Sequence, residues 1–430
     1  MKNFVFLALI LALVVSADKY ALIIGSADGW SNYSITSDPC RAYDLMIDSG
    51  IDASHIIMML YSSNFNYYRN PFPGKIFTDP SDGEGIDYAA KCASHIDYDG
   101  SAIIYDIIPA ILQGKADYIE MAYRIQNPRV FHTNKEDTIF MYFMDHGDKG
   151  VVYVGESEYS EYNWYETFNY MKEFEMYKEI VIYMEACYSG SMFGRFPAEW
   201  NIYAFSSADA DHPALMSNCP PFDKVNGKSI NACMSGLYDN AWLSFVEQSA
   251  GNATLSEVFK YVDESVRKVG SDQGISQWGS VEKFANYPIN RFIGDKLTPS
   301  NKKLSMPNPE SIVSLDKVPR HVATWKAIRA SEEDLEQALK ELSDIVIQET
   351  KRDITMMRIA RAVTNDDVLA EKYRTLVSNS YDDKCVASIN SQLIKKCHFT
   401  TPFSIEMNRM VRNICSNKSA SSISIDEFCL

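Results

Sequence analysis

Short apolar runs alternate with helix-like stretches through roughly the first 300 residues, and this alternation constrains the fold more than any other feature. The runs are KYALIIG (19–25), HIIMMLY (55–61), DTIFMYFMDHG (137–147), EIVIYMEAC (179–187) and WNIYAFSSA (200–208). Between the first two, DPCRAYDLMIDSG places a proline in the first turn of a helix and a glycine at its end. Strands alternating with helices predict a three-layer α/β domain with a mostly parallel central sheet.

Polar residues stand at the carboxyl ends of two of these runs. One run ends in DHG (145–147) and another in EAC (185–187). Because the chemistry of parallel sheets gathers at the carboxyl ends of strands, we expect His146 and Cys187 to meet at one edge. A thiol attacks a carbonyl as thiolate, so it needs a neighbour such as His146 to accept its proton. The backbone N–H groups of Gly147 and Cys187 are candidates for an oxyanion site.

Each of these residues also has an unreactive interpretation. A buried cysteine is usually a small hydrophobe, and an isolated histidine is usually a satisfied polar group. Both together at strand ends, each beside an acid, favour nucleophilic catalysis. The chain has no CxxC or HxxxH spacing and its seven histidines are scattered, so neither a metal site nor a cofactor is expected.

The charge is negative and unevenly placed. A formal net charge of −16 argues against nucleic acid as a partner, because phosphate binding needs clustered lysine and arginine. Residues 1–296 carry 22 basic and 39 acidic residues, net −17, whereas residues 297–430 carry 19 and 18, net +1. The two parts are expected to attract each other.

The first residues, MKNFVFLALILALVVSADKY, predict a secretory signal peptide over residues 1–17. Lys2 supplies the positive start, and Ala17 ends a small-residue cleavage site. The apolar run is shorter than the roughly 20 residues of a membrane span, and no later run is long enough, so no transmembrane anchor is expected. The mature chain should begin near Asp18 in a secretory or vesicular compartment.

The pattern changes after the predicted catalytic domain, residues 18–296. The stretch DKLTPSNKKLSMPNPESIVSL (295–315) contains three prolines and little periodicity, so residues 297–330 are predicted to be an exposed linker. Residues 331–430 are helical in pattern, with a capped start at Ser331. An apolar stripe follows at Leu335, Leu339, Leu342 and Val346.

Nine cysteines divide into three groups. Four in the last 46 residues predict two disulfides whose connectivity stays open, and Cys219 and Cys233 are candidates for a third. Cys40, Cys92 and Cys187 remain, so at least one thiol is free.

Several segments resemble the legumains, the asparaginyl endopeptidases with a caspase-like fold. MDHGDKG (144–150) and EACYSGSMF (185–193) are similar to their His and Cys blocks. IIGSADGWSNYSITSDPCRAYDLM (23–46) is similar to their first block, and HIIMMLY followed by NPFPGKIF to their second. The C-terminal cysteines resemble those of the helical legumain prodomain. The resemblance covers nearly the whole chain and implies a cysteine endopeptidase that cleaves after asparagine.

The family implies particular roles. Cys187 would be the nucleophile, His146 the general base and acid, and Asn32 the residue that orients the histidine. Asn32 also lies in an N-glycosylation pattern, for which Asn252 and Asn417 are better candidates. Glu185 would sit at the base of the pocket for P1, the residue before the cut, or would be a strand-end acid that fixes a loop.

The pocket departs from the family. Legumains follow the matching asparagine, after one residue, with Arg-His, where this chain has Ser34-Ile35. That arginine grips the P1 carboxamide or carboxylate together with the acid matching Glu185. The family's later pocket serine and aspartate fall near Ala214 and Gly236. Substitutes nearby are Ser206, Ser207 and Asp209, with Ser34 itself. Cleavage after Asn, or Asp in acid, is expected, with a relaxed or shifted P1 preference as the alternative.

The resemblance also implies a self-processing zymogen. The helical region would cover the cleft until cleavage after Asn301 or Asn308, and would loosen in acid because protonated carboxyl groups attract it less. Implied partners are protein and peptide substrates, this intramolecular inhibitor and cystatin-type inhibitors. The implied compartment is a lysosome- or vacuole-like vesicle, with secretion or the cell surface as alternatives. The implied disulfides are Cys385–Cys415, Cys397–Cys429 and Cys219–Cys233.

Three other functions stay open. A ligase or transpeptidase would use the same acyl-enzyme, with an amine in place of water. A lipid-anchor transamidase shares the His and Cys blocks, but the cysteine-rich tail and the lack of a late membrane span argue against it. A catalytically weak binding protein on the same fold would fit the altered pocket.

Overall fold

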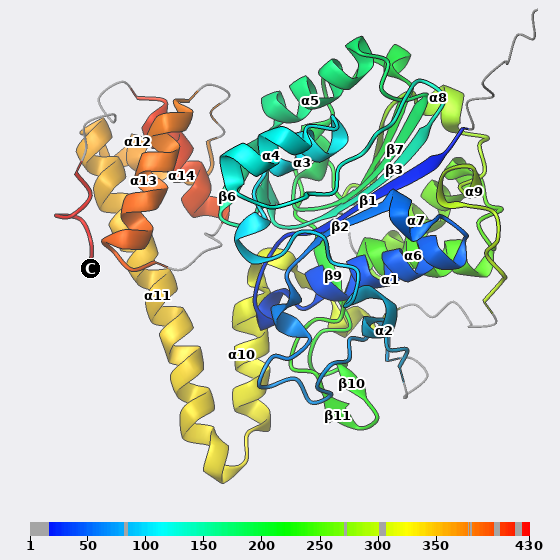
Figure 1. Ribbon diagram of the computed structural model, residues 1–430. Coiled ribbons are helices and arrows are strands. Elements are labelled where there is room, and N and C mark those ends of the chain that lie inside the picture. The colour runs from blue at the N-terminus through cyan, green and yellow to red at the C-terminus, as the bar shows by residue number, and fades with distance from the viewer. Residues whose placement is uncertain are drawn as a thin grey trace, which may run out of the picture.

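The computed structural model describes residues 17–80, 85–270, 273–300, 307–376, 378, 381–399, 405–417 and 424–430. Its centre is a six-stranded sheet in the order β13-β8-β7-β3-β1-β2 (Figure 1). Neighbouring strands are parallel except for β13 and β8. The strands are β1 (Lys19–Gly25), β2 (Ile56–Leu60), β3 (Thr138–Met144), β7 (Glu179–Glu185), β8 (Ile202–Ser206) and β13 (Ser276–Gly279). The five apolar runs form the five parallel strands, which confirms the predicted α/β fold.

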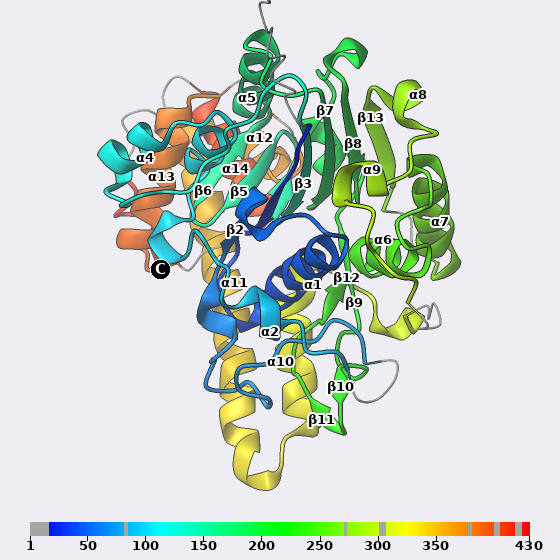
Figure 2. The ribbon, with the colours of Figure 1, turned by 45° about the vertical axis from the view of Figure 1, so that its right-hand side comes forward.

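Helices cover both faces of this sheet (Figures 1 and 2). On one face pack α1 (Ser34–Asp48), α6 (Leu237–Gln248) and α7 (Leu255–Lys268), and on the other α3 (Ile107–Leu112), α4 (Ala116–Tyr123) and α5 (Glu161–Glu173). Along β1, Ala21 and Ile23 belong to the first buried layer, and Leu22 and Ile24 to the second. Burial on both faces explains why the strands are continuous apolar runs. Shorter helices are α2 (Ala89–Cys92), α8 (Val281–Phe284) and α9 (Asn290–Ile293).

Three small sheets border the carboxyl end of the main one. One contains β4 (Gly147–Asp148), β5 (Val151–Val154) and β6 (Ser157–Ser160). Another is the hairpin of β10 (Lys224–Val225) and β11 (Lys228–Ser229). The third has the order β12-β9-β14, with β12 (Ser235–Gly236), β9 (Leu215–Ser217) and β14 (Val313–Ser314). Because β14 comes from the predicted linker, this sheet joins the C-terminal part of the chain to the α/β domain.

The C-terminal part is helical. A hairpin of α10 (Val318–Arg329) and α11 (Glu332–Thr364) projects from the sheet domain (Figure 2). The far end of α11 packs with α12 (Asp367–Lys372), α13 (Asp383–Lys395) and α14 (Ile405–Cys415) around a separate buried cluster. The disulfides Cys385–Cys415 and Cys397–Cys429 tie this cluster together and agree with the pairs implied above.

Three features differ from, or add to, the sequence analysis. Helix α10 occupies much of the predicted linker 297–330, because its proline stands in the first turn, where a helix tolerates it. The apolar stripe of α11 is not buried: Leu335 is 39% exposed and Leu339 is 50% exposed. Cys40 pairs with Cys92, which joins α1 to α2.

None of the helices within the described ranges has the length and apolar character that a membrane span requires. The predicted signal peptide lies outside the described residues except for Ala17.

Candidate active site

The ends of β3 and β7 bring His146 and Cys187 to the same edge of the sheet. The two strands are adjacent and parallel, with Met144 beside Glu185. Each chain continues two residues further, to the histidine and to the cysteine. A Cβ atom on Gly147 would lie 2.4 Å from the carbonyl oxygen of Cys187, so the two strand ends are in direct contact.

Asn32 orients the imidazole of His146. The Asn32 side-chain amide donates from Nδ2 to the carbonyl oxygen of Asp28 at 2.6 Å, which directs Oδ1 toward the histidine. His146 Nε2 lies 3.0 Å from that oxygen, so Nε2 carries the hydrogen and donates it. The lone pair is then on Nδ1, and this nitrogen can accept a proton.

Cys187 is the one free thiol among the described residues, because the other eight cysteines form disulfides. The backbone N–H of Ala214 donates to its Sγ at 3.3 Å. The chain turns sharply just after it: Tyr188 has a φ of 58°, an unfavourable value for a tyrosine, and its N–H donates to the His212 carbonyl oxygen at 2.9 Å. Such strain is typical of a residue that a functional turn holds in place.

Burial keeps both catalytic candidates neutral in this form of the protein. It lowers the pKa of His146 to about 4, although the nearby Asp316 carboxylate acts in the opposite direction. It also raises the pKa of the Cys187 thiol far above its usual range; the hydrogen bond from Ala214 opposes this, and Asp316 adds to it. Asp316 therefore lies near both groups, and both the thiol and the imidazole are neutral.

The geometry of Gly147 suits an oxyanion site. Gly147 lies opposite Val152 in the antiparallel pair of β4 and β5. The N–H of Tyr153 donates to the carbonyl oxygen of His146 at 3.0 Å, so Gly147 belongs to the pair that exchanges no hydrogen bonds. Its N–H faces away from β5, where a developing oxyanion can accept it.

Alanine at position 147 is expected to lower kcat/KM about 100-fold, because its Cβ would displace the carbonyl of Cys187 and misplace the thiol. The measurement is peptide hydrolysis, with thermal unfolding to show that the variant folds. Gly194→Ala is the matched control, since a Cβ there meets nothing within 4 Å. Equal activity of both variants would contradict the proposed contact.

Glu185 belongs to a cluster of three buried carboxyl groups. A Cβ on Gly236 would lie 2.3 Å from Asp239 Oδ2 and 3.3 Å from Glu185 Cδ, so both acids lie against β12. Asp38 accepts hydrogen bonds from the Gly236 N–H and the Ser235 hydroxyl, both at 2.7 Å. Burial raises the pKa of Glu185 well above its usual range, and the two aspartates raise it further. Burial also raises the pKa of Asp239, to about 7. Two carboxylates in contact cannot both be ionised, so one proton shared by Glu185 and Asp239 explains the pair.

The side chains of the other predicted pocket residues are hydrogen-bonded to other groups of the α/β domain. Ser34 is buried at the start of α1, and its hydroxyl donates to Met216 Sδ at 3.3 Å. Ser206 accepts a hydrogen bond from Trp278 Nε1 at 3.0 Å, next to the edge strand β13. Ser207 accepts from the N–H of Ala186 at 3.3 Å, and Asp209 binds His212 Nδ1 at 2.9 Å within its own loop.

Sequence reasoning missed three residues that contact Cys187 or lie with Glu185. Ala214 contacts the sulfur through its backbone, which no side-chain pattern reveals. Asp38 and Asp239 lie on helices, where acids usually face water. The signal available for Asp239 was its position in LYDNAW, between apolar residues on both sides.

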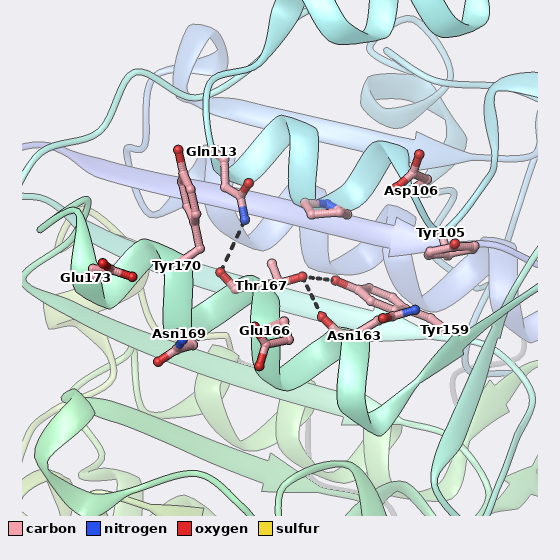
Figure 3. Close-up of a pocket in the computed structure, with 11 residues that line it drawn as sticks. Tyr105, Asp106, Gln113, Tyr159, Asn163, Glu166, Thr167, Asn169, Tyr170 and Glu173 are labelled. Carbon is pink, nitrogen blue, oxygen red and sulfur yellow. Dashed lines mark hydrogen bonds between the residues drawn. The ribbon is translucent and has the colours of Figure 1, made fainter. Parts of the chain in front are cut away.

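A groove of about 370 Å³ also opens between α3 and α5 (Figure 3). Its wall includes Gln113, Thr167 and Tyr159, joined by hydrogen bonds. This groove lies on the face of the sheet that α3 and α5 cover, and neither His146 nor Cys187 lines it. Among the described residues, no group of acids, histidines and cysteines is arranged to hold a metal ion.

Comparison with known proteins identifies the family. A family model described as the Peptidase C13 family matches residues 19–295. The hemoglobinase of Schistosoma japonicum is 26% identical over 68% of this chain and 63% of its own length. The vacuolar-processing enzyme beta-isozyme of Arabidopsis thaliana is 25% identical over 93% of this chain and 83% of its own. Among solved structures, caspase-1 of Spodoptera frugiperda matches with a TM-score of 0.33 and 10% identity over 62% of this chain and 89% of that one. The chain therefore belongs to the Peptidase C13 family and is a legumain-like cysteine peptidase.

Proposed function

We propose that the protein is an endopeptidase made as a zymogen, whose C-terminal part blocks the dyad until the chain is cut. The observation that carries this proposal is the pairing of β14 with β9. Val313 lies opposite Met216, and Ser314 opposite Leu215, in an antiparallel ladder. Strand β9 follows Ala214, whose N–H binds the sulfur of Cys187. A substrate strand would need the edge that β14 occupies.

The reaction follows from the groups at the strand ends. His146 Nδ1 takes the thiol proton as Cys187 Sγ attacks the substrate carbonyl carbon. The N–H groups of Gly147 and Cys187 stabilise the oxyanion. The C–N bond then breaks, the amine leaves with the proton from His146, and a thioester remains. Water, deprotonated by the same imidazole, hydrolyses that thioester and frees the thiol.

Ion pairs hold the C-terminal part in place. Arg409 Nε lies 3.1 Å from Asp148, and Arg412 binds the same carboxylate, which is fully buried two residues after His146. Arg409 also lies over the ring of Tyr188, 4.9 Å from its centre. These contacts give the predicted charge attraction specific partners.

A second ion-pair cluster gives the attachment a pH dependence. Glu341 of α11 binds Arg69 of the α/β domain and Lys326 of α10. Partial burial raises the pKa of Glu341, but the hydrogen bonds from Arg69 and Lys326 outweigh this and hold that pKa below its usual range. A carboxyl group whose pKa is lowered by attachment stabilises the attached state at any pH above the group's ordinary pKa. This stabilisation is lost as the pH falls through the lowered pKa of the attached state. Attachment should therefore weaken in acid.

The proposal includes self-processing in the linker, at a bond that need not follow an asparagine. The candidate Asn301 lies outside the described residues. Asn308 is described, and it precedes Pro309 and accepts the N–H of Glu310 at 2.9 Å, so its side chain is already bound in a turn. An acidic vesicle would be the compartment, in line with the name of the vacuolar-processing relative.

The test is incubation of purified wild-type and Cys187→Ala proteins at about pH 4.5 and about pH 7. Wild type should shorten in acid and gain peptidase activity, whereas the variant should stay intact. If both proteins shorten equally without added protease, self-processing is wrong. If neither protein cleaves any peptide at any pH, the proposed endopeptidase activity is wrong.

A further inference from the structure

We propose that the pocket beside Cys187 selects an apolar P1 side chain such as leucine, in place of asparagine. This inference rests on the proposed endopeptidase function and names the substrate class of the same site. It starts from the segment that occupies the substrate edge of β9.

The register of that segment identifies the residue at the P1 position. After Val313 and Ser314 pair with β9, the N–H of Leu315 donates to the carbonyl oxygen of Ala214 at 3.0 Å. The N–H of the same Ala214 donates to Cys187 Sγ at 3.3 Å. The N–H and C=O of one residue in an extended strand point to the same side, so Leu315 and the sulfur lie side by side. The peptide bond that follows Leu315 is therefore the one nearest the nucleophile.

The side chain of Leu315 is buried as a P1 side chain would be. It is 1% exposed. It belongs to one apolar cluster with Cys187 and with Ile35, Ala214, Met216 and Leu237. Ile35 and Ala214 are two of the positions where the sequence departs from the family's polar pocket. Apolar surroundings of this kind favour burial of an aliphatic side chain over a polar one.

In the part of the chain that the structure describes, the acidic cluster around Glu185 has no free positively charged side chain to bind an asparagine at P1. Glu185 and Asp239 lie together against Gly236, Asp38 is the third acid of the cluster, and burial raises the pKa of both Glu185 and Asp239. The cation that acts on this cluster is Arg41, whose guanidinium is bound to Glu247 through Nε and Nη2, both at 2.8 Å. Ser34, at the position of the family's arginine, donates instead to Met216. A P1 carboxamide oxygen would therefore lack its charged donor, which disfavours it.

The bond after Leu315 survives in the zymogen for a local reason. The chain turns at once into the 3-10 turn η8 (Leu315–Lys317), so the segment does not continue extended past the nucleophile. The side chain of Asp316 is held within this turn by the Ser314 hydroxyl at 2.5 Å. Leu315 thus fills the pocket without presenting a productive bond.

The test uses the wild-type protein after acid activation and three fluorogenic peptides. All three carry the sequence of residues 310–319, with leucine, asparagine or arginine at the position of Leu315. The leucine peptide should be cut after leucine, with kcat/KM about tenfold or more above the other two. An equal or higher kcat/KM for the asparagine or the arginine peptide would overturn the inference while leaving the peptidase intact. No cleavage of any of the three, together with no cleavage of an unfolded protein substrate, would instead refute the proposed function.

Two pocket variants sharpen the test. Ser34→Arg restores the family's cation and should raise the ratio of asparagine to leucine cleavage about tenfold or more, whereas Ser34→Ala should leave it unchanged. A folded Ser34→Arg variant with an unchanged ratio would contradict the assigned pocket. If this variant does not fold, the wild-type peptide ratios decide the question alone.

Discussion

Replacing Cys187 by alanine is expected to lower kcat/KM for peptide hydrolysis by about four orders of magnitude or more. The thiol is the one free nucleophilic sulfur among the described residues, and it follows β7 at the same edge of the sheet where His146 follows the adjacent strand β3. Without it no thioester forms, and the remaining groups can only polarise the carbonyl. The measurement is initial rates on a fluorogenic peptide, with circular dichroism to confirm the fold.

The matched comparison is His146→Ala and the double variant. Because the thiol and the imidazole act as one unit, removing both should cost little more than removing either. A Cys187→Ala protein that retains more than about one per cent of wild-type activity would contradict the assigned nucleophile.

Replacing Arg409 and Arg412 together by alanine is expected to make the uncut protein active near neutral pH, by about 100-fold over wild type. Asp148 is fully buried and bound by both guanidinium groups. Removing the partners of a buried charge costs about 3–5 kcal/mol, which favours detachment of the C-terminal part and hydration of the carboxylate. The measurement is peptide hydrolysis at about pH 7 by protein that gel electrophoresis shows to be full length.

Lys396→Ala is the control for this experiment. Lys396 pairs with Asp426 within the C-terminal part, and both side chains are substantially exposed, so its removal should change little. If the double arginine variant is folded and as inactive as wild type at neutral pH, these ion pairs do not hold the block in place.

The strands, and the placing of His146 and Cys187 after two adjacent strand ends, could be predicted because each has a local signature. β3 and β7 are buried on both faces, so their residues are apolar throughout and polar residues mark where they end. Asn32 entered through the resemblance, and the structure places its oxygen on His146.

The pairing of β14 with β9 could not be predicted in this way. β14 is two residues long and is held to β9 by backbone hydrogen bonds, which leave no trace in side-chain pattern. The prediction of an exposed linker therefore missed the segment that pairs with β9. The disulfide between Cys40 and Cys92 was missed for a similar reason. Folding brings α1 and α2 together, whereas sequence spacing left Cys40, Cys92 and Cys187 all without an assigned partner.

The central claim is that Cys187 forms the covalent intermediate with help from His146. The most direct test is to react the acid-activated protein with a peptidyl acyloxymethyl ketone and to locate the adduct by peptide mass mapping. The account predicts one adduct, on Cys187, that His146→Ala greatly slows. Hydrolysis at the wild-type rate after complete labelling of Cys187, or an active protein that never acquires the adduct there, would contradict it.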